Sequence, residues 1–134
     1  MAEQPLTADS RKFLGELRDL LLEQHKLLLD RERAEYEKAH GPIAGPGPLL
    51  TLVIEDPHFA WLRQISMLVV EIDEALSPRN NAAQRVAEAL TARAREMMRP
   101  DEQGNDFQVR YCHAVKEAPE IGTLQGRIAK LLEI

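Results

Sequence analysis

The chain has 134 residues, with 17 basic and 22 acidic side chains and a formal charge of −5. Its single cysteine, Cys112, excludes an intramolecular disulfide and a cysteine-based zinc knuckle. The N-terminal residues lack the basic and apolar segments of a signal peptide, and no apolar run is long enough for a membrane span. The sequence therefore predicts one cytoplasmic domain over residues 1–134. The 12 arginines and 16 alanines are typical of a GC-rich bacterial coding bias.

Residues 8–40 have the pattern of one long helix. Projected at about 100° per residue, the charged side chains fall in one wedge, while the leucines spread over roughly 220° of the remainder. An ordinary surface helix has an apolar stripe of little more than ~100°. A helix of this length would also extend for about 50 Å, beyond the shorter helices that follow. We therefore expect neighbours on both sides, supplied by the same chain or by a second copy.

The rest of the chain divides at its prolines. Gly41–Pro48 predicts a stiff turn, and Leu49–Ile54 predicts one or two helical turns. Asp56-Pro57 and Ser77-Pro78 are typical helix starts, and Asn105 is a typical N-cap. Three helices are expected from these signals and a last one after Pro119: residues 56–76, 78–99, 105–118 and 119–132. No segment alternates like a strand, so the predicted fold is all-α: a four-helix-type bundle with a long N-terminal helix and a short additional C-terminal helix.

Polar side chains inside the apolar arc of the first helix are the unusual feature of the sequence. His25, Glu32 and Glu35 lie within that arc, and a buried carboxylate needs a partner. One interpretation is a metal or haem site inside the bundle, with His25, Glu32 and Asp73 as ligands. The other is a structural role, in which the glutamates lie where the helix leaves the core or pair with Arg93.

A second acidic group lies at the end of the 56–76 helix, where the helix dipole disfavours negative charge. Its carboxylates are Glu71, Asp73 and Glu74, and residues 79–99, with five arginines and two glutamates, follow immediately. We expect these arginines to neutralise the acidic group. Because the arginine-rich helix carries no aromatic side chain for stacking on bases, we expect no nucleic-acid partner.

The sequence contains no phosphate-binding glycine loop, nucleophile elbow or His-Glu-x-x-His motif. It therefore favours a non-enzymatic protein without an assigned cofactor, which self-associates or binds another protein through the long first helix. A homodimer is the favoured assembly, and no membrane partner is expected. The predicted interaction residues are apolar or aromatic: Leu20, Leu22, Leu27, Leu29, Tyr36 and Trp61. The alternative is a metal- or haem-binding helical bundle.

Overall fold

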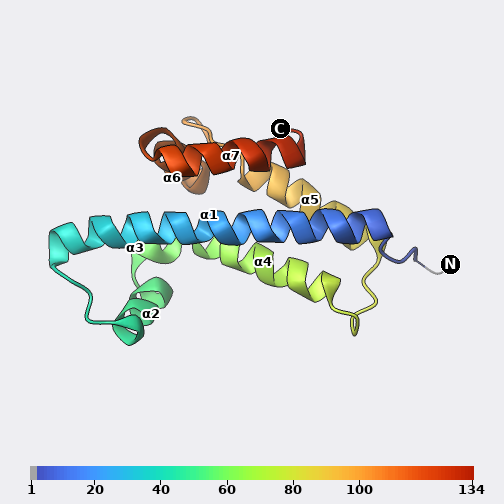
Figure 1. The fold of residues 1–134 in the computed structure, drawn as a ribbon, viewed down its shortest axis with the longest axis horizontal. Helices are drawn as coiled ribbons and strands as arrows, with labels where there is room; N and C mark the ends of the chain where they lie inside the picture. The colour runs from blue at the N-terminus through green and yellow to red at the C-terminus, as the bar shows by residue number, and fades with distance from the viewer. Residues whose placement is uncertain (1–2) are drawn as a thin grey trace.

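The computed structural model describes residues 3–134, and within them the chain forms seven helices (Figure 1). The only β feature of these residues is an isolated bridge between Pro5 and Ala83. The predicted all-α class is confirmed. The helices are α1 (Ala8–His40), α2 (Pro46–Glu55), α3 (Pro57–Ala60), α4 (Arg63–Leu76), α5 (Gln84–Met97), α6 (Asp106–Glu117) and α7 (Pro119–Leu132).

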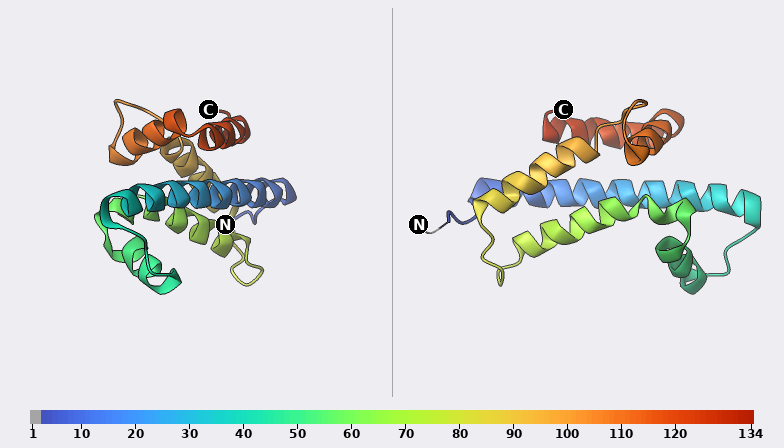
Figure 2. Two further views of the ribbon diagram at one scale, coloured as in Figure 1. Left: turned by 60° about the vertical axis from the view of Figure 1, so that its left-hand side comes forward. Right: turned by 180° about the vertical axis from the view of Figure 1, so that it is seen from behind.

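Helix α1 is the spine of the molecule and has the predicted bounds. The Thr7 side chain accepts a hydrogen bond from the Ser10 amide at 3.0 Å, and Gly41, with φ at 84°, ends the helix. Helices α4 and α7 lie on opposite sides of α1 (Figures 1 and 2). They bury one set of leucines completely: Leu14, Leu17, Leu21 and Leu28.

The neighbours of α1 therefore come from its own chain, and a second copy is not required to cover the broad leucine surface. Within α1, Leu22 is the only large apolar side chain that is exposed, at 48%. Leu20, Leu27 and Leu29 are half-buried and pack against the core. Of the two sources that the sequence left open for these neighbours, the structure shows the first, the same chain.

A buried polar chain fixes α7 against α1. The Gln24 side-chain amide donates to the Tyr111 hydroxyl at 2.7 Å and to the Ile121 carbonyl at 3.0 Å. Tyr111 donates to Gln125, whose amide donates to the Met98 carbonyl at 2.9 Å. This buried series of hydrogen bonds links four helices, because Gln24 belongs to α1, Tyr111 to α6, Gln125 to α7, and Met98 directly follows α5.

The helix predicted over residues 56–76 is divided in two. Asp56 caps α3 as expected, since its carboxylate accepts from the His58 amide at 2.8 Å. Trp61 and Leu62 then form a turn before α4 begins. Both side chains are buried, with 6% and 1% exposed, as is Phe59. The backbone at Trp61 and Leu62 stays in the right-handed helical region, and the bonds from the Leu62 amide to the Phe59 carbonyl and from the Ile65 amide to the Leu62 carbonyl tighten the turn.

Helix α5 begins at Gln84, six residues after the predicted start. The preceding residues form a loop in which Asn81 has a positive φ of 43°. This loop pairs with the N-terminal segment, because the Leu6 amide donates to the Ala82 carbonyl and the Gln84 amide to the Gln4 carbonyl. The pairing holds the backbone extended where a helix was predicted.

Helix α2 confirms the helical turns predicted for residues 49–54 and begins earlier, at Pro46, inside the expected stiff turn. None of its ten residues is buried. It extends from below α3, on the same side of α1 as α4 and away from α6 and α7 (Figures 1 and 2). Together, α2 and α3 lie beneath the end of α1 that projects beyond α4.

The C-terminal pair follows its local signals. Asn105 forms a capping box with Gln108, and Pro119 is the first residue of α7. Helix α7 has 14 residues, as many as α4 and α5, so the predicted short last helix is a full member of the bundle.

Candidate protein-binding groove

The structure does not bring the three predicted metal ligands together. The His25 ring lies 3.0 Å from the Ser66 hydroxyl, and Asp73 pairs with Arg18 at 3.2 Å on the surface. Glu32 lies two helical turns beyond His25, about 10 Å along the axis of α1. In the part of the chain that the structure describes, no group of three or more His, Cys, Asp or Glu side chains could hold a metal ion.

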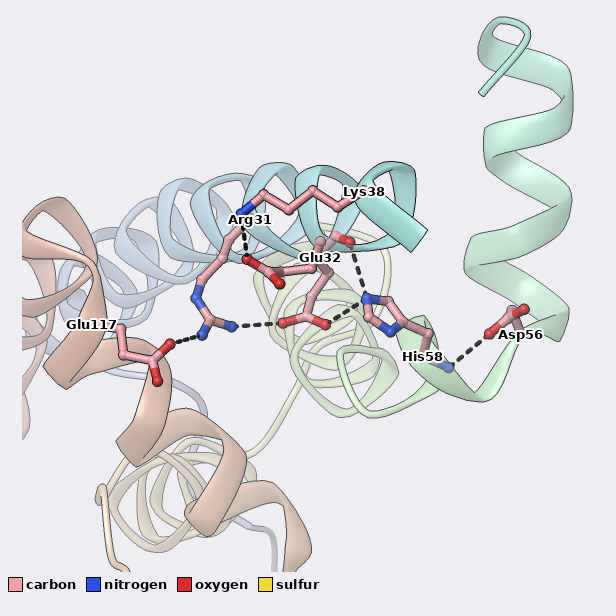
Figure 3. A network of polar contacts seen from close by, with 7 residues as sticks. Arg31, Glu32, Lys38, Asp56, His58 and Glu117 are labelled. Atoms are coloured by element: carbon pink, nitrogen blue, oxygen red, sulfur yellow. Dashed lines mark hydrogen bonds and ion pairs between the residues drawn. The ribbon is translucent and has the colours of Figure 1, made fainter. Parts of the chain in front are cut away.

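Glu32 is buried as the sequence indicated, and its carboxylate is paired (Figure 3). Arg31 donates to it at 2.9 Å, and the His58 ring lies 3.0 Å from its other oxygen. Arg31 also binds Glu117 on α6. The Glu32 network therefore ties α1 to α3 and α6. Arg93 is not the partner of Glu32, because it pairs with Glu71. The predicted neutralisation of the acidic group by residues 79–99 holds for Glu71 alone, since Asp73 pairs with Arg18 of α1.

His25 is half-buried between α1 and α4. Burial lowers the pKa of His25 from its ordinary value of 6.5. The imidazole is therefore held in its neutral form, with Nε2 hydrogen-bonded to Ser66. The contact joins α1 to α4, and it occupies the Nε2 atom of His25 with a hydrogen bond.

The predicted interaction residues fall into different environments. Trp61 is buried against Phe107, with ring centroids 5.4 Å apart, so its ring belongs to the core and cannot meet a partner. The Tyr36 ring packs against the Phe59 ring, with the ring centroids 5.6 Å apart. Leu20 and Leu27 lie at the edge of α1 that faces α7, where both line surface hollows.

These hollows form a continuous groove between α1 and α7. Three adjoining hollows have volumes of about 650, 370 and 460 Å³. The first and second share Glu23 and Arg127, and the second and third share Leu27, Pro119 and Glu120. From Glu16 to Asp30 the groove follows α1 for about 20 Å.

Leucines line the groove at two levels. Leu20 of α1 and Leu131 of α7 line the first hollow, and Leu27 and Leu124 line the second. The leucines within each helix are seven residues apart, which is two helical turns or about 10 Å. Between the two levels, Glu23 and Arg127 approach to 3.9 Å across the groove.

The two walls of the groove carry opposite charge. The α1 wall carries four carboxylates, those of Glu16, Asp19, Glu23 and Asp30, and one cation, Arg31, which is paired with Glu32 and Glu117. The α7 wall carries the cations Arg127 and Lys130, with Glu120 near the start of α7. Leu20 and Leu27, which line the α1 wall, were among the interaction residues predicted from the sequence. Leu124 and Leu131, which line the α7 wall, were not, although they repeat the same seven-residue spacing.

Fold and groove together define an all-α bundle with a charged, leucine-lined surface groove. Comparisons of the chain with protein-family models, with curated proteins and with solved structures found no match. Over residues 3–134, none of the helices combines the length and the apolar character needed to cross a membrane.

Proposed function

We propose that this protein is a non-enzymatic, protein-binding bundle whose α1–α7 groove accepts an amphipathic helix of a partner protein. The observation that carries the proposal is the pair of leucine levels, Leu20 with Leu131 and Leu27 with Leu124. Three of these four side chains are half-buried and pack on the core, so each retains apolar surface for a partner. A partner helix with apolar residues seven apart would contact both levels.

The shape of the groove favours a helix over a small molecule. Small-molecule sites are concave and enclose most of the ligand surface. The groove is instead elongated, over about four turns of α1, and is crossed once, by the exposed Glu23–Arg127 pair. A third helix lying between two antiparallel helices buries its apolar face and leaves its polar face in water.

Charge on the two walls specifies the partner further. The carboxylates of α1 favour lysine or arginine along one edge of the partner helix, and Arg127 and Lys130 favour glutamate or aspartate along the other. A helix with acidic residues on both edges would meet the four carboxylates of α1 unfavourably. The groove is therefore expected to select for charge as well as for apolar spacing.

The test uses fluorescent designed peptides that share one leucine face. One peptide carries lysine on one edge and glutamate on the other, and a second carries glutamate on both edges. Fluorescence anisotropy should show saturable binding of the first peptide and binding about tenfold weaker or more for the second. The proposal is overturned if neither peptide binds, or if both bind equally.

Two variants locate the site on the protein. Leu27→Lys places a charge inside the groove, and we expect about a tenfold loss of affinity or more for the mixed-charge peptide. Leu22→Lys is the matched control, because Leu22 is an exposed leucine of the same helix that does not line these hollows. Equal effects of the two substitutions would show that the peptide binds elsewhere.

A further inference from the structure

Helix α4 presents a second unpartnered stripe, which points away from α1. Arg63, Met67, Val70 and Glu74 are spaced by four, three and four residues, so they share one side of the helix. All four are exposed, Met67 at 55% and Val70 at 54%. The opposite side of α4 supplies Ile65, Leu68 and Ile72 to the core.

The order of these residues makes the stripe complementary to itself. When two copies of α4 lie antiparallel about a two-fold axis between Met67 and Val70, Met67 of each copy faces Val70 of the other. Arg63 of each copy then faces Glu74 of the other. A parallel arrangement would instead bring Arg63 against Arg63 and Glu74 against Glu74. Charge therefore selects the antiparallel direction.

We propose that a second copy of this chain docks on the α4 stripe, through an antiparallel α4 pair with an apolar centre and an ion pair at each end. The Arg63 side chain already donates to the carbonyl of Ile54, at the end of α2. The described residues supply no ion pair to the Glu74 side chain, whose carboxylate is exposed.

The exposed apolar side chains of α2 also favour a second copy of this chain as the occupant of the α4 stripe. Leu50 and Ile54 are 60% and 54% exposed, and a ten-residue helix that buries none of its residues is only marginally stable in water. Because α2 extends on the α4 side of the molecule (Figures 1 and 2), a copy seated on α4 would provide it with apolar contacts. Residues 46–55 contain no lysine or arginine, which disfavours an anionic membrane surface as the occupant.

This surface is separate from the groove described above. Helix α7 forms one wall of the groove and lies on the other side of α1 from α4 (Figure 1). A second copy on α4 and a partner helix in the groove could therefore bind at the same time. The dimer inference stands whether or not the groove binds a helix.

Sedimentation equilibrium of the full chain tests the inference. The wild-type protein should dimerise reversibly with concentration. Glu74→Arg, which leaves the Arg63 contact with Ile54 in place, should weaken dimerisation about tenfold or more, because it sets like charges opposite each other twice. The exchanged pair Arg63→Glu with Glu74→Arg should recover most of that loss.

Met67→Glu should also weaken the dimer by about tenfold or more, and Leu22→Glu, on α1, should leave it unchanged. Circular dichroism and thermal melting of each variant check that it is folded. A wild-type protein that stays monomeric overturns the inference. A dimer that tolerates Glu74→Arg and Met67→Glu, or that the exchanged pair does not restore, overturns it as well.

Discussion

Replacing Tyr111 by phenylalanine tests whether the buried polar chain holds α7 against α1. In the wild type the Tyr111 hydroxyl accepts from Gln24 at 2.7 Å and donates to Gln125. All three residues are buried, and burial raises the pKa of Tyr111 well above its ordinary value of 10.0, so the hydroxyl stays protonated. The substitution keeps the ring and removes only the oxygen.

The expected cost follows from the groups left without partners. The Gln125 side-chain oxygen loses its donor, and one Gln24 amide proton loses its acceptor. Each orphaned buried group costs about 1–3 kcal/mol. Because the Gln24 amide keeps its bond to Ile121, we expect a total near the lower half of that sum, roughly 2–4 kcal/mol. For a domain of this size that corresponds to a fall in Tm of roughly 10 °C.

Urea unfolding of a double-mutant cycle provides the measurement. Within residues 3–134 no group donates to the Gln24 side-chain oxygen, so Gln24→Leu removes one orphaned group as well as a donor. Gln24→Leu combined with Tyr111→Phe should therefore cost clearly less than the sum of the two single changes. A Tyr111→Phe cost below about 0.5 kcal/mol, or strict additivity, would refute the reasoning.

Three further predictions concern stability. Burial places the folded-state pKa of His25 below 6.5, so the unfolded state takes up the proton first as the pH falls. The contribution of His25 to stability should therefore be constant above about pH 6.5, decrease between pH 6.5 and the folded-state pKa, and level off below it. Urea midpoints across pH should lose this slope in His25→Gln and keep it in the exposed His113→Gln. Glu32→Gln should lower the free energy of unfolding in urea by about 1–3 kcal/mol, because it weakens a buried ion-pair network. The control Glu35→Gln, at an exposed pair, should change it by less than about 0.5 kcal/mol, and equal costs would contradict the role of burial. Asn105→Ala should cost about 1 kcal/mol and lower the melting temperature, since it removes the cap of α6, and an unchanged melting curve would contradict this.

The features of the fold that were predicted correctly depend on local signals. Gly41 ends α1, Asn105 caps α6, and Pro119 separates α6 from α7, all within a few residues of the structure that they specify. The late start of α5 was missed because it depends on a contact between Leu6 and Ala82, far apart in the sequence. Local propensity does not contain that information.

The candidate site shows the same division. Periodicity placed Leu20 and Leu27 on the apolar side of α1, but it does not say which helix becomes the neighbour. The metal interpretation treated His25 and Glu32 as near one another because they share an apolar arc. Their seven-residue separation along the helix axis, about 10 Å, already opposes that reading. The actual partner of Glu32, His58, became adjacent only through the packing of α3 against α1.

The order of α1 and α7 along the chain has a consequence for biosynthesis. Helix α1 is translated well before α7, which covers one side of it. At roughly 5–20 residues per second, a ribosome needs about 5–20 s to proceed from the end of α1 to the end of α7. During that interval the leucine-rich nascent segment lacks its final cover, so the newborn polypeptide should be a substrate for ribosome-associated chaperones.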